Sequence, residues 1–110
     1  MDPSTRSNPE AVVTENTARS RFEISLDGET VGWADYAPIE GGLAITHTEI
    51  DPRFGRRGLG VRLLHDAFVQ LRDSGRQIVP ACSFAVKYVA RNPGWMELVV
   101  PAWRERIRDR

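Results

Sequence analysis

The sequence is poor in the side chains that form disulfides and metal centres. Among its 110 residues there is one cysteine, Cys82, and there are two histidines, His47 and His65. A single cysteine cannot form an internal disulfide, and so few nitrogen and sulfur ligands argue against a structural zinc centre. We therefore expect no bound metal.

Long apolar runs are also missing from the sequence. No run approaches the roughly 18 residues that a membrane-spanning helix needs, and the N-terminus lacks the apolar segment of a signal peptide. Hydrophobic residues still make up 41% of the chain, which is enough for the core of one domain. These features predict a folded cytoplasmic protein without a membrane partner.

Charge is balanced over the whole chain but not within its halves. Residues 1–50 hold nine acidic side chains against three arginines, and residues 51–110 hold twelve basic side chains against six acidic ones. The basic half suits an anionic ligand held at one place. It does not amount to the continuous basic surface that grips nucleic acid, so we expect no nucleic-acid partner.

Composition divides the chain into three stretches. Residues 1–20 are rich in Ser, Thr, Asn, Pro and charge, which predicts a disordered polar tail. Residues 21–103 carry the periodic apolar patterns of a folded domain. Residues 104–110 contain four arginines, which we expect to form a charged, solvated end.

Apolar periodicity within the domain predicts three strands, a helix, a fourth strand and a second helix. The expected strands are 22–26, 30–37, 43–50 and 77–80, and the expected helices are Leu59–Asp73 and 84–91, with Ser83 as N-cap. Turns at 27–28 and 38–42 make the first three strands an antiparallel meander. Residues 95–100 fit either a strand or a helix. The order predicts an α/β fold of the α+β type, with one mixed sheet built from a β-meander followed by α-β-α.

The third expected strand changes character along its length. Period-two alternation places Leu43 and Ile45 on one face, and His47 and Glu49 follow on the same face. A carboxylate or imidazole is unfavourable in a core unless it has a partner or faces a cleft. We therefore expect a cleft at this end of the strand.

A glycine-rich loop, Asp-Pro-Arg-Phe-Gly-Arg-Arg-Gly-Leu-Gly over residues 51–60, follows that strand and opens the first helix. Glycines let a ligand approach the main chain, and the unpaired N–H groups and dipole of a helix start attract an anion. The basic side chains around it are Arg53, Arg56, Arg57 and Arg62. The simplest ligand is a phosphate or a pyrophosphate.

The motif is neither a Walker loop nor a dinucleotide-binding fingerprint, because it lacks Gly-Lys-Ser/Thr and the G-x-G-x-x-G order. Gly58-x-Gly60 opening a helix after Glu49-Ile-Asp-Pro52 resembles the acetyl-CoA pyrophosphate loop of GNAT-type N-acetyltransferases. The segments 22–26, 46–50, 57–60 and 80–88 further resemble a short, single-domain subgroup of that superfamily. The resemblance extends over about residues 21–100.

The resemblance implies acetyl-CoA as co-substrate and an amine, in a small molecule or a protein, as acetyl acceptor. Main-chain groups of the third strand would pair with the pantetheine arm, and N–H groups of 56–61 would hold the pyrophosphate. The implied cofactor-binding residues are Thr48, Ile50, Gly55, Arg56, Arg57, Gly58, Leu59, Gly60, Val61 and Arg62. Gly55 departs from the family, which usually has Gln or Arg at that position.

The resemblance also implies that Tyr88 protonates the departing thiolate, with ordinary helix packing as the alternative. The family's usual positions for a general base hold Ala44 and Thr46, and neither can accept a proton. Glu49 and His47 are the available bases for removing the proton of the amine. An arginine ion pair for Glu49 and a carbonyl-bonded imidazole for His47 are the structural alternatives.

Cys82 comes at the start of the second expected helix, where the helix dipole favours a thiolate. It could accept the acetyl group covalently, lie against the CoA thiol, or serve as a small buried hydrophobe. The missing bases at 44 and 46 keep a second function open, a CoA- or acyl-CoA-binding module with little or no catalysis. The sequence leaves the acceptor and the oligomeric state open.

Overall fold

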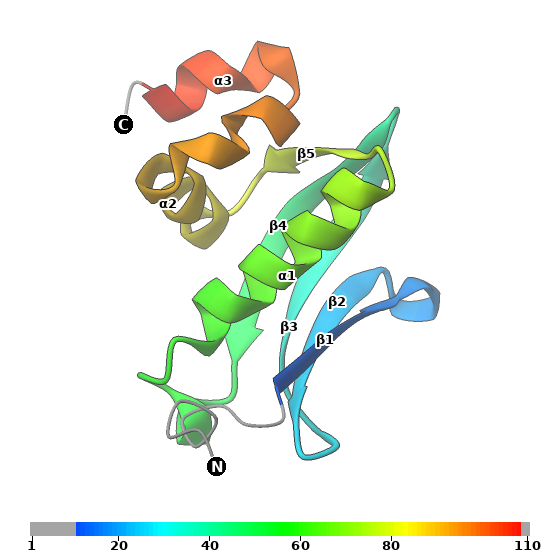
Figure 1. The fold of residues 1–110 in the computed structure, drawn as a ribbon, viewed down its shortest axis with the longest axis vertical. Coiled ribbons are helices and arrows are strands. Elements are labelled where there is room, and N and C mark those ends of the chain that lie inside the picture. Colours follow the sequence, from blue (N-terminus) through cyan, green and yellow to red (C-terminus); the bar gives the residue numbers. More distant parts are fainter. Residues whose placement is uncertain (1–10, 109–110) are drawn as a thin grey trace.

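The computed structural model describes residues 11–108, in which one five-stranded mixed sheet carries the helices (Figure 1). The strands lie in the order β1-β2-β3-β4-β5, with β5 parallel to β4 and the other pairs antiparallel. The strands are β1 Ala11–Asn16, β2 Arg21–Leu26, β3 Glu29–Ile39, β4 Gly42–Ile50 and β5 Gln77–Pro80. The helices are α1 Leu59–Asp73, α2 Ser83–Arg91 and α3 Pro101–Arg108, and the short 3-10 turns are η2 Thr17–Arg19, η3 Pro52–Phe54 and η4 Pro93–Leu98. The predicted mixed sheet is confirmed.

Helix α1 supplies more buried side chains to the core than any other helix or strand of the described residues, and it has the predicted bounds. It lies along one face of the sheet (Figure 1). Its buried side chains recur at helical spacing and are Leu59, Leu63, Leu64, Ala67, Phe68 and Leu71. Phe68 is fully buried and makes edge contacts with Tyr88 and Trp95, at ring-centroid distances of 5.4 and 5.5 Å. Aromatic edge packing of this kind fixes α2 and η4 beside α1.

None of the helices in residues 11–108 is both long and apolar enough to cross a membrane.

The prediction of a disordered tail over residues 1–20 is wrong for its second half. Residues 11–16 form β1, which pairs with β2 along its whole length, and η2 follows. The sequence of β1 lacks the apolar alternation that predicts a strand, because Val13 is the only member of β1 that is buried. The rest of the predicted tail, residues 1–10, lies outside the described residues.

The prediction of a solvated end at 104–110 is also wrong over its described part. Residues 104–108 belong to α3, and Ile107 is 5% exposed within the core. The Arg104 side chain donates a hydrogen bond to the Val99 carbonyl at 3.1 Å. One apolar residue among many arginines is too weak a signal for sequence periodicity. The ambiguous stretch before it contains both forms, the turn η4 and then a parallel bridge between Val99 and Ile78.

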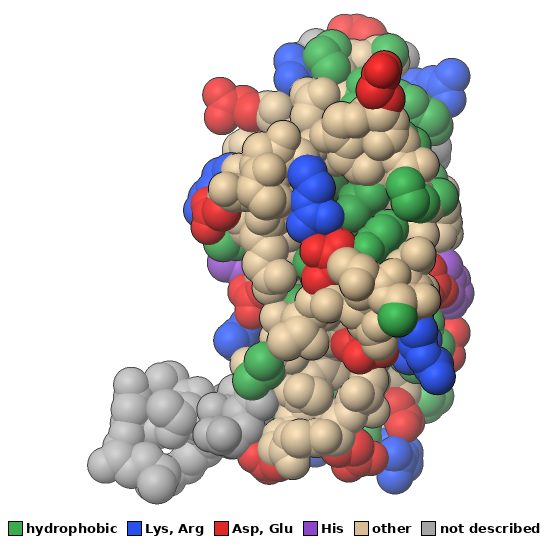
Figure 2. All heavy atoms as spheres, turned by 90° about the vertical axis from the view of Figure 1, so that its right-hand side faces the viewer, with side chains coloured by type: hydrophobic (Ala, Val, Ile, Leu, Met, Phe, Trp, Pro, Cys, Tyr) green, Lys and Arg blue, Asp and Glu red, His purple; other side chains and the backbone are tan. Residues whose placement is uncertain are grey.

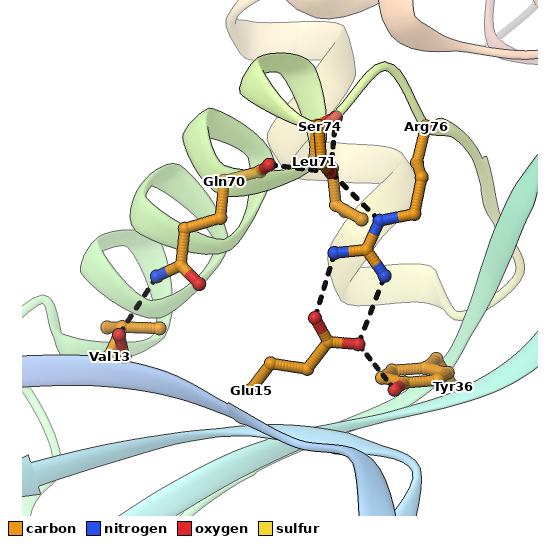
Figure 3. A network of polar contacts seen from close by, with 7 residues as sticks. All are labelled: Val13, Glu15, Tyr36, Gln70, Leu71, Ser74 and Arg76. Carbon is orange, nitrogen blue, oxygen red and sulfur yellow. Dashed lines mark hydrogen bonds and ion pairs between the residues drawn. The ribbon is translucent and has the colours of Figure 1, made fainter.

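Besides its pairing with β2, β1 is linked to β3 and to the end of α1 by a polar network (Figure 3). The Arg76 guanidinium, just after α1, donates two hydrogen bonds to the Glu15 carboxylate at 3.1 and 2.8 Å. The Tyr36 hydroxyl donates to the same carboxylate at 2.6 Å, and Gln70 donates to the Val13 carbonyl. The hydrogen bonds from Arg76 lower the pKa of Glu15, and burial with the bond to Glu15 raises the pKa of Tyr36 to about 12.

Glu15→Gln is expected to lower the free energy of unfolding by about 1.5–3 kcal/mol, the range for a hydrogen bond to a charged group. Because the pKa of Glu15 is lowered in the folded state, its contribution is complete above the ordinary value of 4.5 and disappears as pH falls below it. Urea unfolding of the wild type and the variant at several pH values measures this contribution to the free energy of unfolding. Glu29→Gln, at an exposed ion pair with Arg53, is the control and should change stability by less than about 0.5 kcal/mol. A difference between Glu15→Gln and wild type that persists unchanged below pH 4.5 would contradict the assignment.

Charged side chains do not segregate on the face that Figure 2 shows. Acidic and basic side chains are interspersed there, with hydrophobic side chains gathered between them in the upper half of the view. This face of the described residues therefore has no continuous basic area of the kind that binds nucleic acid.

Candidate functional site

The two parallel strands diverge at one end of the sheet. Strands β4 and β5 pair from Gly42–Gln77 to Ile45–Pro80, and the Ala81 N–H still donates to the Ile45 carbonyl at 2.9 Å. Beyond this point β4 continues to Ile50, whereas the segment that follows β5 turns away into α2. Residues 46–50 of β4 therefore have an edge that β5 does not cover.

The hydrogen bonds of β3 show which main-chain groups point to this open edge. The Asp51 N–H donates to the Val31 carbonyl of β3 at 2.8 Å. Successive residues of an antiparallel strand turn their main-chain groups to opposite sides, so those of Thr48 and Ile50 point away from β3. These are the residues expected to pair with the pantetheine arm.

A β-bulge in β4 corrects the predicted faces of this strand. Asp35 pairs with His47 and the next residue, Tyr36, pairs with Ile45, so Thr46 is an extra residue in β4. A bulge shifts the alternation by one residue. Thr48 consequently lies on the helix-covered face with Ile45, opposite the buried Ala34.

His47 and Glu49 therefore lie on the other, open face of the sheet, and the prediction that they share a face with Leu43 and Ile45 is wrong. His47 is opposite Asp35, and Glu49 is opposite Trp33. Their side chains are 55% and 50% exposed, and His47 Nε2 lies 3.0 Å from Glu49 Oε1. His47 is two residues beyond the last β4–β5 pair, which places it near the level of Cys82.

The loop before α1 presents a main-chain surface. Arg56 and Gly58 both have positive φ, 64° and 72°, and Gly58 is the N-cap of α1 without a side-chain cap. The first N–H groups of the helix, those of Leu59, Gly60 and Val61, thus have no intrahelical acceptor. Glycine at position 58 keeps this left-handed conformation free of strain.

A pocket of about 320 Å³ lies between this loop and the open edge of β4. Among the residues expected to bind the cofactor, those lining the pocket are Thr48, Ile50, Gly55, Arg56, Gly58, Leu59, Gly60 and Val61. The structure places Arg57 and Arg62 in other contacts. The Arg62 guanidinium pairs with Asp66 at 2.7 Å, and that of Arg57 lies 5.3 Å from the centroid of the Phe54 ring.

Sequence reasoning missed two residues of this pocket, Phe54 and Phe84. Phe84 comes from α2 and lies so close to Gly60 that a Cβ there would be 2.7 Å from Cζ of the ring. A side chain at position 60 would therefore force the Phe84 ring to move, besides covering the main chain at the start of α1. The second glycine of the motif was the signal that could have indicated a close neighbour.

Cys82, and not the predicted Ser83, is the N-cap of α2. Its Sγ accepts a hydrogen bond from the Ala85 N–H at 3.4 Å. The same Sγ lies 3.6 Å from the hydroxyl oxygen of Thr48 on β4. The Thr48–Cys82 contact therefore connects the two diverging strands at the inner end of the open edge.

Tyr88 lies apart from this contact. Its hydroxyl accepts a hydrogen bond from Trp95 Nε1 at 2.9 Å, and its ring packs against Phe68. Burial raises the pKa of Tyr88 above its ordinary value of 10.0, which favours the neutral phenol. It also lines a small hollow of about 100 Å³ with Val61 and Phe84, beside the main pocket.

A mixed sheet whose parallel strands diverge beside a glycine loop matches the GNAT fold. Residues 21–98 match the sequence profile of a family described as GCN5-related N-acetyl-transferase, so the chain belongs to this family. The structure is similar to the crystal structure of the ribosomal-protein-S18-alanine N-acetyltransferase from Escherichia coli, with a TM-score of 0.55. The match covers 83% of this chain and 68% of that chain at 18% sequence identity, a level that shows the fold alone. No curated protein sequence matches this chain significantly.

Proposed function

We propose that the protein transfers the acetyl group of acetyl-CoA to an amine, in the cleft between β4 and the start of α2. The observation that carries this proposal is the open edge of β4. It runs from the start of α1, which has no side-chain cap, to the Thr48–Cys82 contact, and Thr48 and Ile50 on this edge line the same pocket as the glycine loop. An extended thioester with a phosphate at one end matches those features in order.

The cofactor would lie along this edge as an added strand. Main-chain groups of Thr48 and Ile50 would hydrogen-bond the pantetheine amides, as one strand pairs with the next. The N–H groups at the start of α1 would bind the pyrophosphate, with the helix dipole and Arg56 contributing positive charge. The acetyl thioester would then reach the Thr48–Cys82 contact.

The transfer needs a neutral amine, whereas a lysine-like amine has a pKa of about 10.4 and is mostly protonated at neutral pH. His47, held by its contact with Glu49 on the open face of the sheet, accepts the proton through water that connects it with the cleft. The amine nitrogen attacks the acetyl carbonyl carbon, the C–N bond forms and the C–S bond breaks. The nitrogen gives up its second proton to water in the cleft, and the CoA thiolate takes up a proton from that water to become the thiol. A main-chain N–H of β4 stabilises the oxyanion of the tetrahedral intermediate.

We assign Cys82 and Tyr88 to the architecture of the site. Cys82 caps α2 and contacts Thr48, so it lies against the thioester without forming a bond to the acetyl group. The Tyr88 hydroxyl is occupied by Trp95 within the packing of α2 on α1. Water in the open cleft is then the proton source for the thiolate.

Calorimetric titration with acetyl-CoA and with CoA, followed by mass spectrometry of the intact protein, tests this proposal. We expect saturable binding of both ligands and no added acetyl mass, with turnover when an amine panel is supplied. Cys82→Ser should retain the cap and the activity, because serine is itself a favoured N-cap. An acetyl group on Cys82 would replace direct transfer by a covalent route. Binding without turnover of any amine would favour a CoA-binding module, and no binding would refute the function.

A further inference from the structure

A second pocket, of about 410 Å³, lies between the start of α2 and α3. The side chains that matter for its chemistry are Cys82, Lys87, Trp103 and Arg106. Much of the remaining lining is apolar and includes Val86 and Ile107. The proposed cofactor lies in the first pocket and does not account for this second one.

The second pocket meets the cofactor cleft at Cys82. Cys82 lines the second pocket, and its Sγ is 3.6 Å from the hydroxyl oxygen of Thr48, which lines the first. A molecule in the second pocket would therefore approach the same point as the acetyl group of a cofactor in the first. Two pockets that meet at the reacting atoms are what a two-substrate transfer needs.

The charged side chains of the second pocket indicate which kind of ligand it would attract. Lys87 and Arg106 are its basic residues, and no acidic residue among 11–108 lines it. The Arg106 guanidinium lies 4.4 Å from the centroid of the Trp103 ring, a cation–π contact that holds its charge beside the pocket. An ammonium ion alone would be repelled here, whereas a carboxylate would be attracted.

We propose that the second pocket binds the acetyl acceptor, a small primary amine that also carries a carboxylate several bonds away. This inference rests on the proposed acetyl transfer. The carboxylate lies at Lys87 and Arg106, and the amine reaches the Thr48–Cys82 contact. Since a helix rises about 1.5 Å per residue, Cys82 and Lys87 are separated by roughly 7 Å along α2. An ω-amino acid such as ε-aminocaproate is long enough to join the two ends.

The test uses the three tryptophans as position markers. The protein, labelled with ¹⁵N and saturated with CoA, is titrated with ε-aminocaproate while its indole N–H signals are recorded. We expect a saturable shift of the Trp103 signal, identified with Trp103→Phe, and little change for Trp33 and Trp95. Hexylamine, which lacks the carboxylate, should bind at least about tenfold more weakly, a difference of about 1.4 kcal/mol. Equal binding of the two ligands, or a shift at Trp33 or Trp95 alone, would overturn the inference.

Charge variants give a second criterion. Lys87→Gln combined with Arg106→Gln should remove the preference for ε-aminocaproate over hexylamine. Arg91→Gln removes a positive charge from the same helix at a different hollow and should keep the preference. A preference that survives the double substitution would refute the assignment. Calorimetry with CoA on the same sample reports the cofactor cleft separately, so loss of the acceptor site can be distinguished from failure of the proposed acetyl transfer.

Discussion

Gly58→Asp is expected to weaken binding of acetyl-CoA about a hundredfold or more, the equivalent of about 2.7 kcal/mol. The new carboxylate would stand at the N-cap of α1, beside the proposed pyrophosphate position. Two like charges about 5 Å apart repel by about 3 kcal/mol at the effective dielectric constant of a protein surface. The fold should survive, because Asp tolerates the left-handed φ of 72° better than most residues do. Calorimetry at low and high salt measures the effect, which should shrink as salt screens the repulsion.

Two matched variants distinguish the effect of the aspartate charge from the effects of side-chain size and of position in the fold. Gly58→Asn has the size and the backbone tolerance of the aspartate variant without its charge, so it should lose much less affinity. Gly28→Asp puts the same charge on another left-handed glycine, with φ of 86° in the β2–β3 hairpin. It should bind acetyl-CoA as the wild type does. If Gly58→Asp bound as tightly as Gly58→Asn, the phosphate would not lie at this loop.

The parts of the fold that a local pattern determines could be predicted from the sequence. Helix α1 has a regular apolar face, and β5 is a short apolar run, so their predicted bounds agree with the structure. Strand β1 could not be predicted in the same way. Its place depends on pairing with β2 and on contacts with residues far along the chain, such as the ion pair of Arg76 with Glu15.

The candidate site shows more clearly where prediction from apolar periodicity fails. Eight of the ten residues expected to bind the cofactor line one pocket, because glycine spacing and a helix start are local signals. The faces of β4 were mispredicted because one bulged residue, Thr46, reverses the alternation that follows it. The bulge is visible only in the pairing of β4 with β3. It moves Thr48 toward the cleft and turns His47 and Glu49 to the open face.

That position of His47 leads to the second large effect. His47→Gln is expected to lower kcat by about a hundredfold or more, the usual contribution of a general base, without changing the affinity for acetyl-CoA. Glu49→Gln should cause a smaller loss, because the ring keeps a hydrogen-bond partner but loses the charge that stabilises an imidazolium. The measurement is the initial rate of CoA release with an amine that the wild-type protein acetylates, together with calorimetry for the cofactor.

His65 provides a closely matched control for this substitution. Its side chain is 55% exposed, like that of His47, and its Nδ1 lies 2.9 Å from the Asp66 carboxylate. It is on α1, away from the diverging strands, so His65→Gln should retain the wild-type rate. An unchanged rate in His47→Gln would remove His47 as the base. A similar loss in both variants would mean that the rate responds to helix and strand stability, and the proton would then have to leave through another group.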